Sequence, residues 1–431
     1  MKLKSDLVIK SLFNCFNYLM SKTKNNMNKN PKVVFSNFKN CWRHVAMYNL
    51  AKEFKSGGTP STKELNYWNG KIPWIQSSDL QNDSLFGVKP QKFISEEGLQ
   101  NSSAKLISKS SIAIVTRVGV GKLAIIDQDY TTSQDFLSLS DLNGDTQFLV
   151  YRIYRMLQRE STQLQGTSIK GITKEDLLSK RISIPESLEE QSTIGSLFRT
   201  LDDLLTSYKN NLANYQSLKA AMLSKMFPKA GQTVPEIRLD GFKGEWEVKK
   251  LENVLEFYAG LTYKPNDMVS DGTLVLRSSN VRDGELIYKD NVFVNPDIVN
   301  CQNVKLGDIV VVVRNGSRDL IGKHALIKSE MPNTVIGAFM TGVRCEVPEF
   351  VNALLDTNMF ISEINKNLGA TINQITTGNF KRMKFHFPDK EEQQVIGSYF
   401  ANLDDLIAVH QEKISQLETL KKKFLKDMFI K

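Results

Sequence analysis

"EEQSTIGSLFRTLDDLL" occupies Glu189–Leu205, and "EEQQVIGSYFANLDDLI" occupies Glu391–Ile407. The two stretches are nearly the same, and the second follows the first by 202 residues, from position 189 to position 391. The match continues without a gap to Phe227 in the first copy and Phe429 in the second. A segment repeated at such a long interval predicts a duplicated architecture, in which each copy has the same structural role.

Each copy predicts a long amphipathic helix, because its apolar residues recur in steps of four and three, the spacing of a coiled-coil seam. About 40 helical residues span roughly 60 Å. A helix of that length cannot bury its whole apolar stripe on one small domain, so we expect the two helices to pack on each other as an antiparallel coiled coil. The predicted helix-pairing residues are Ile194, Phe198, Leu201, Leu205 and Leu212 in the first copy, and Ile396, Phe400, Leu403, Ile407 and Ile414 in the second.

Local signals mark the ends of these helices. Ser187 with Glu190, and Asp389 with Glu392, fit the capping box in which residues three apart satisfy the first free N–H groups of a helix. Pro228 predicts the end of the first helix. The two spacer helices are therefore predicted at 187–228 and 389–431.

The sequence between the helices is repeated as well. Each half opens on a Pro…Phe-Lys-x-x-Trp segment, continues through short β-branched stretches separated by Gly and Asn turns, and ends in helical pieces. The matched segments are 31–42 with 235–246, 75–80 with 276–281, 112–119 with 309–316, and 166–173 with 369–376. The pattern predicts an α+β fold of two tandem-repeated globular domains, 31–186 and 229–388, joined by the paired helices with pseudo-twofold symmetry. The helical pieces are expected at 145–160 and 349–367.

The first 30 residues lie outside the repeat. The polar run "SKTKNNMNKN" within them has the composition of a disordered segment. We interpret 1–30 as a disordered leader or as the product of an upstream start, with Met20 or Met27 as the native initiator.

Composition restricts the class of partner. The chain has 56 basic and 47 acidic residues, a formal net charge of +9, which favours a polyanion such as nucleic acid. The four cysteines and four histidines show no metal-ligand spacing, so we expect no metal site, and cysteine usage favours the cytoplasm. No apolar run approaches the roughly 20 residues that a membrane span needs.

Exposed loops that interrupt the matched strands are where base edges and phosphates would be contacted by Arg, Lys, Asn, Ser and Asp. The candidate DNA-binding residues are Ser77, Ser78, Asp79, Arg117, Lys122 and Lys170 in the first half, and Arg277, Ser278, Ser279, Asn280, Arg314, Asn315, Arg318 and Lys323 in the second. The repeated Ser-Ser pairs are equally compatible with capping a turn, and Arg117 and Arg314 with gripping phosphate or a structural carboxylate. Positions that differ between the halves, such as Val118 against Asn315, are the better candidates for specificity.

The alternation of two variable domains with two near-identical helices resembles the specificity subunit of type I restriction-modification enzymes. The "EEQ..IG..F..LD.LI" helix openings and the Pro…F-K-x-x-W entries carry this resemblance from about Pro31 onward. It implies that each domain is a target recognition domain for one half of a split, asymmetric site in double-stranded DNA. It also implies that the helices set the spacing and dock two methyltransferase subunits, to which restriction subunits add. S-adenosylmethionine, ATP and magnesium would then be bound by those partners and not by this chain.

Motifs for chemistry are incomplete. An amino-methyltransferase carries an N/D-P-P-Y/F tetrapeptide, and the nearest string here is "NPDI" at Asn295. "GVGK" at Gly119–Lys122 lacks the Ser or Thr that completes a phosphate loop. We therefore expect a non-catalytic subunit. Two alternatives remain at this stage: a self-sufficient DNA methyltransferase or nuclease, and a coiled-coil scaffold without a DNA role.

Overall fold

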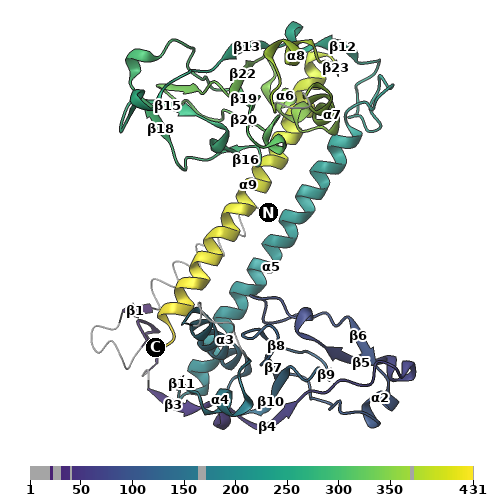
Figure 1. Ribbon diagram of the computed structural model, residues 1–431, viewed down its shortest axis with the longest axis vertical. Helices are drawn as coiled ribbons and strands as arrows, with labels where there is room; N and C mark the ends of the chain where they lie inside the picture. Colours follow the sequence, from purple (N-terminus) through teal and green to yellow (C-terminus); the bar gives the residue numbers. More distant parts are fainter. Residues whose placement is uncertain (1–19, 23–30, 39–40, 164–170, 369–372, 431) are drawn as a thin grey trace. The chain divides into compact units, whose positions relative to one another are not determined.

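The computed structural model describes residues 20–22, 31–38, 41–163, 171–368 and 373–430 (Figure 1). The chain forms two compact units: unit 1 contains Met1–Tyr208 and Lys413–Lys431, and unit 2 contains Lys209–Glu412. Each unit therefore combines one globular domain with parts of both long helices. None of the helices in the described ranges is long and apolar enough to cross a membrane.

Unit 1 is built around a four-stranded antiparallel sheet in the order β4-β10-β7-β8. Its strands are β1 (Met20–Lys22), β2 (Val33–Phe35), β3 (Trp42–Ala46), β4 (Ala51–Ser56), β5 (Trp68–Ile75), β6 (Lys92–Ile94), β7 (Ile112–Val115), β8 (Leu123–Ile125), β9 (Thr131–Thr132), β10 (Phe136–Leu142) and β11 (Arg181–Pro185). Its α-helices are α2 (Glu96–Gln100), α3 (Thr146–Gln163), α4 (Lys174–Ser179) and the first part of α5 (Leu188–Lys225). A second sheet has the order β6-β5-β9, with β5 and β9 parallel, and β11 pairs with β3.

The central sheet is buried on both faces, as the side chains of strand β7 show. Ile112 and Ile114 belong to the cluster that contains the helices, whereas Ala113 and Val115 belong to a separate cluster beside the second sheet. Successive side chains of a strand point to opposite faces, so an uninterrupted apolar run is what a strand between two packed layers requires.

Unit 2 repeats this plan. Its strands are β12 (Glu247–Lys250), β13 (Glu256–Ala259), β14 (Met268–Val269), β15 (Thr273–Leu276), β16 (Val281–Arg282), β17 (Glu285–Leu286), β18 (Val292–Val294), β19 (Ile309–Val312), β20 (His324–Leu326), β21 (Thr334–Ile336), β22 (Met340–Arg344) and β23 (Lys384–Phe387). Its α-helices are α6 (Pro348–Leu355), α7 (Asn358–Asn367), α8 (Thr377–Arg382) and the first part of α9 (Lys390–Asp427). The sheets β13-β22-β19-β20, β14-β18-β15-β21 and β12-β23 correspond to those of unit 1, with β14 and the hairpin β16–β17 as additions. The predicted α+β duplication is confirmed.

One predicted helix is divided in two. The stretch 349–367 forms α6 and α7, separated at Asp356 and Thr357. The Thr357 hydroxyl donates to the Leu354 carbonyl at 2.7 Å and accepts from the Phe360 N–H at 3.2 Å. This side chain therefore ends one helix and caps the next, because a threonine hydroxyl can bond the backbone in place of the regular helical hydrogen bonds.

The long helices run antiparallel within each unit. In unit 1 the rings of Phe198 and Phe429 stack with centroids 5.4 Å apart, and one turn further along α5 the Asp202 carboxylate meets Lys421 Nζ at 2.5 Å. The partner residues step backward along α9 as the first residues step forward along α5. Unit 2 shows the same order, since Tyr215 contacts the ring of His410 and Lys219 pairs with Asp404.

Burial along the predicted seam is uneven. Phe198 and Phe400, near the helix starts, are fully buried in the cores of their own units, whereas Leu212, Ile407 and Ile414, in the middle stretches, are only half-buried. The start of each stripe is therefore covered by the adjoining domain as well as by the other helix. The reason is that α3 and α6 lie directly against the helix starts: a Cβ at Gly195 or Gly397 would come closest to the backbone nitrogen of Phe148 or Phe350.

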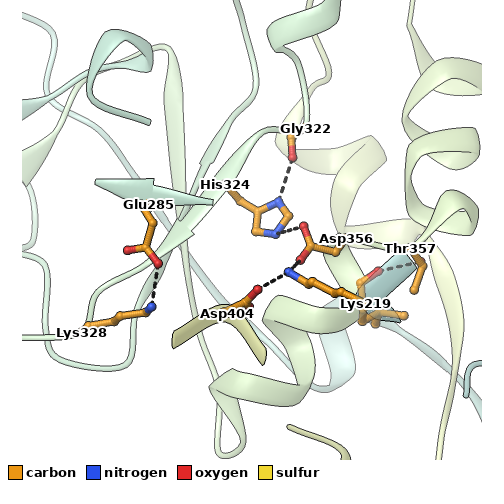
Figure 2. A network of polar contacts seen from close by, with 9 residues as sticks. Lys219, Glu285, Gly322, His324, Lys328, Asp356, Thr357 and Asp404 are labelled. Carbon is orange, nitrogen blue, oxygen red and sulfur yellow. Dashed lines mark hydrogen bonds and ion pairs between the residues drawn. The ribbon is translucent and has the colours of Figure 1, made fainter. Parts of the chain in front are cut away.

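A polar network in unit 2 links the two long helices to the end of α6 (Figure 2). Lys219 Nζ lies 2.6 Å from the Asp356 carboxylate and 2.5 Å from that of Asp404. His324, which is 6% exposed, places Nε2 3.4 Å from the second Asp356 oxygen. Burial raises the pKa of Asp404 above its ordinary value, with Asp356 adding to the rise and Lys219 opposing it. Helix α5 is thus tied both to α9 and to the end of α6.

The segment 1–30, predicted as a leader, lies mostly outside the described residues. The exception is β1, which pairs antiparallel with β2 through Met20 opposite Phe35 and Lys22 opposite Val33.

Candidate nucleic-acid interface

The candidate residues of unit 1 gather where β7 ends. The strand is followed by Thr116 and Arg117, and the Ile172 N–H donates to the Thr116 carbonyl at 2.7 Å. A Cβ at Gly171 would lie 3.3 Å from the Arg117 Cα, so the segment after residue 170 runs directly beside this arginine. We call this region strand-end surface 1; it consists of Ser77–Asp79, Arg117–Lys122 and Gly171–Glu175.

The turn at Ser77–Asp79 is held from within. Lys122 Nζ donates to the carbonyl oxygens of Ser77 at 3.2 Å and Leu80 at 2.8 Å. The Asp79 carboxylate accepts from the Gln76 N–H at 3.1 Å, which closes a capping box. Lys122 and Asp79 therefore position the turn, while Ser78 and Arg117 have exposed side chains.

A hollow of about 1100 Å³ opens beside Arg117. Its lining includes Ser56, Gln134, Lys174 and Glu175, which sequence reasoning did not select. No motif marks these residues, since they come from separate parts of the chain and meet only in the fold. The hollow combines hydroxyl, amide, basic and acidic groups, the inventory that base edges and phosphates require.

Unit 2 brings the equivalent residues together at the end of β19. Asn315 Nδ2 donates to the Ser278 hydroxyl at 2.8 Å, and the Asn315 N–H donates to the Asn373 carbonyl at 3.2 Å. Arg314, one residue earlier, has an exposed side chain. We call this region strand-end surface 2; it consists of Arg277–Asn280, Arg314–Gly316, Phe339 and Asn373–Gln374.

The turn at Ser278–Asn280 is also held internally. Asn280 is fully buried, and its Nδ2 donates to the Ile287 carbonyl at 3.0 Å. Its Oδ1 accepts from the Arg277 N–H at 3.0 Å, while an Arg277 guanidinium nitrogen donates to the Asp290 carbonyl at 2.6 Å. Asn280 thus shapes the turn from inside, and Ser279 is its exposed member.

The remaining candidates are more scattered. The Arg318 guanidinium donates to the Asn365 carbonyl at the end of α7, at 3.5 Å, and Lys323 is exposed at the start of β20. Lys170 lies outside the described residues.

Phe339 is a member of strand-end surface 2 that sequence reasoning missed. Its ring is 50% exposed, and the Arg314 guanidinium lies 4.9 Å from the ring centroid. The backbone N–H groups of Val313 and Arg314 both donate to the Phe339 carbonyl. In a single sequence an aromatic residue beside a strand reads as core, so no pattern distinguishes this exposed ring from a buried one.

Comparisons with known proteins agree with this architecture. Residues 45–215 and 243–419 each match the family described as the type I restriction modification DNA specificity domain. The specificity subunit of the type I restriction enzyme MjaVIII from Methanocaldococcus jannaschii is 26% identical over 293 residues, covering 64% of this chain and 68% of that protein. The EcoR124I/EcoR124II specificity subunit from Escherichia coli is 31% identical over 167 residues, covering 36% of this chain and 40% of that one.

The fold has a solved counterpart. The S subunit of a type I restriction-modification system from M. genitalium superimposes with a TM-score of 0.65 at 17% identity, over 93% of this chain and 99% of that one. The family match covers both units, and members of this family are the non-catalytic specificity subunits of restriction systems. The chain, with its two DNA specificity domains, belongs to the type I restriction-modification specificity (S) subunit family.

Proposed function

We propose that this chain reads a bipartite, asymmetric target in double-stranded DNA, with strand-end surface 1 reading one half and strand-end surface 2 the other. The observation that supports this proposal is that the two surfaces occupy the same place in the repeat but present different side chains. Val118 is 71% exposed in unit 1, where unit 2 has Asn315 bonded to Ser278. Equivalent positions with different chemistry are what two unlike half-sites require.

The two long helices act in this proposal as a spacer and a docking platform. Both α5 and α9 contribute residues to both units, so they connect the two readers directly. We propose that they fix the gap between the half-sites and bind two methyltransferase subunits, to which restriction subunits add. S-adenosylmethionine, ATP and magnesium belong to those partners, and this chain contributes recognition without chemistry.

An exchange of one globular domain tests the reading role. Residues 247–387 would be replaced by the corresponding segment of a relative with a different target, and the methylated motif would be mapped in cells that also carry the methyltransferase subunit. We expect one half of the motif to change while the other half and the gap stay as they were. An unchanged motif, with the chimaera folded and assembled, would refute the proposal.

Matched insertions test the spacer. Four residues added after Leu212 in α5 and four after Glu412 in α9 lengthen both helices by about 6 Å while keeping their antiparallel pairing. Because B-DNA rises about 3.4 Å per base pair, we expect the gap to grow by roughly two base pairs with both half-sites unchanged. A gap of the original length would contradict the spacer role.

Ionic strength provides a further check. Contacts to phosphates release counterions, so DNA affinity should fall linearly with the logarithm of salt concentration. Affinity independent of salt would exclude phosphate contacts by Arg117 and the other basic residues of the two domains.

A further inference from the structure

Strand-end surfaces 1 and 2 differ in the residue that directly precedes the strand paired with the arginine's own strand. Thr116 donates its N–H to the Asp135 carbonyl, and Val313 donates its N–H to the Phe339 carbonyl. These bonds are equivalent in the repeat, because Phe136 pairs with Val115 as Met340 pairs with Val312. Phe339 therefore occupies the place that Asp135 has in unit 1, directly before the strand that pairs with the arginine's own strand.

The ring of Phe339 organises the Arg314 guanidinium. The guanidinium carbon lies over the ring, 4.9 Å from the ring centroid, so cation–π attraction restricts the position of the cation. Among the described residues, Arg314 makes no ion pair with a carboxylate. A cation–π contact uses no hydrogen-bond acceptor, so the N–H groups of the guanidinium remain available to bind two acceptors at once.

Two kinds of DNA group match such a fork: the O6 and N7 acceptors of guanine, and a phosphate. Phosphates are the same in every sequence, so an arginine that grips phosphate would be expected to keep the same neighbour in both repeats. The repeat position that places a ring beside Arg314 instead holds Asp135 in unit 1, whose carboxylate accepts from the Ser133 hydroxyl at 3.4 Å. Arg314 also lies beside amide and hydroxyl groups of Asn315 and Ser278, where base edges rather than the backbone would be read.

We infer that the guanidinium of Arg314, positioned by the ring of Phe339, reads a guanine in the half-site recognised by unit 2. This inference rests on the proposed function. It assigns a base-contacting role to Arg314 and a positioning role to Phe339, and it gives Arg117 no such preference.

The test uses the assembled complex of this chain with its methyltransferase subunits. First, the wild-type methylated motif must contain a guanine, on either strand, in the half that changes when residues 247–387 are exchanged; a half-site without guanine overturns the inference. DNA binding is then measured on oligonucleotides in which each such guanine is replaced in turn by 7-deazaguanine, which lacks the N7 acceptor.

At one position we expect the replacement to weaken wild-type binding by roughly ten-fold, since a bidentate contact carries about 1–3 kcal/mol of discrimination. Arg314→Ala should bind both oligonucleotides equally, and Phe339→Leu should show a reduced difference at that same position. Arg282→Ala is the matched control, because Arg282 is an exposed arginine of unit 2 outside strand-end surface 2.

The outcomes distinguish a failure of the inference about Arg314 from a failure of the proposed function. If Arg314→Ala weakens binding to every oligonucleotide equally and keeps the discrimination, Arg314 grips phosphate and the inference is wrong. If the domain exchange leaves the motif unchanged, the proposed function fails before the question of Arg314 arises. Thermal unfolding of each variant establishes that any loss of binding is not a loss of folding.

Discussion

The two units build the same helix junction with different polar partners. In unit 1, Glu190 near the start of α5 is 3% exposed and accepts a hydrogen bond from Trp42 Nε1 at 3.0 Å. In unit 2, the equivalent Glu392 is fully buried and is held by the Arg238 guanidinium through two bonds of 2.8 and 2.7 Å. Trp246, the counterpart of Trp42, is buried there, and its Nε1 has no hydrogen-bond partner within the described part of the chain.

The second contrast concerns the lysines that cross between the helices. Lys421 in unit 1 pairs with Asp202, whose other oxygen accepts from the Tyr151 hydroxyl at 2.6 Å. Lys219 in unit 2 pairs with both Asp404 and Asp356. The lysine–aspartate pair is retained in the repeat and its third member is not. The duplicated fold thus preserves the lysine–aspartate pair and changes the third polar group that contacts it.

The largest expected effect follows from removing the partner that only unit 2 has. Arg238→Met leaves the Glu392 carboxylate buried without a cation, and losing one member of a buried pair typically costs about 3–5 kcal/mol. We expect unit 2 to be destabilised by about 3 kcal/mol and unit 1 to be unaffected. Hydrogen exchange measured by mass spectrometry resolves the two units; equal destabilisation of both would contradict the contrast.

The lysines give a smaller, paired effect. Lys219→Met removes the ammonium that bonds both Asp404 and Asp356, whereas Lys421→Met affects only Asp202, which keeps its bond from Tyr151. We expect Lys219→Met to cost about 2 kcal/mol more than Lys421→Met. Since burial already raises the pKa of Asp404, the protonated acid is favoured in the folded state, so the stability of Lys219→Met should increase as pH falls and be lost as pH rises through that pKa. Chemical unfolding of Lys219→Met across pH 4–8 measures this dependence of stability on pH. A stability that does not change with pH would contradict the prediction that two carboxylates face each other.

The smallest expected effect is a difference in sign between the stability changes caused by replacing Glu190 and Glu392. Burial raises the pKa of Glu190, with the Trp42 bond opposing the rise, so ionised Glu190 costs stability once pH exceeds the folded-state pKa. Glu190→Gln keeps an acceptor for Trp42 and should stabilise unit 1 by up to about 1 kcal/mol at neutral pH. Glu392→Gln should instead destabilise unit 2 by a similar amount, because Arg238 loses its carboxylate. Opposite signs in hydrogen exchange are required; the same sign for both would refute the comparison.

Most of the fold could be predicted because its signals are local. The 4-3 spacing of Ile194, Phe198 and Leu201 indicates a helix within a few turns, and its repetition at Ile396 indicates a duplicated fold. The division between α6 and α7 was missed, since Thr357 is an ordinary helix residue until its hydroxyl bonds the backbone. The Ser187–Glu190 cap formed at its first half, with the Glu190 N–H bonded to Ser187, but the glutamate side chain reaches Trp42 from a distant segment.

The location of the candidate site could be predicted better than the role of each of its side chains. Sequence reasoning selected the turns and strand ends that the structure brings together. It could not distinguish Ser78, which is exposed, from Asn280, which is buried, or foresee that Lys122 would bond carbonyl oxygens. Whether a polar side chain faces solvent or holds a turn depends on neighbours far along the chain, such as Ile287 for Asn280. The same is true of Phe339 beside Arg314.

The interleaving of α5 and α9 has a consequence for how this chain is made. The core of unit 1 contains Leu417, Phe424, Met428 and Phe429, which are synthesised after all the strands of that unit, the last of which ends at Pro185. While the ribosome is still translating unit 2, the apolar surface of the first domain that these residues cover remains exposed. We therefore expect the N-terminal domain to mature last, and its nascent form to need shielding until residues 413–430 have emerged from the exit tunnel.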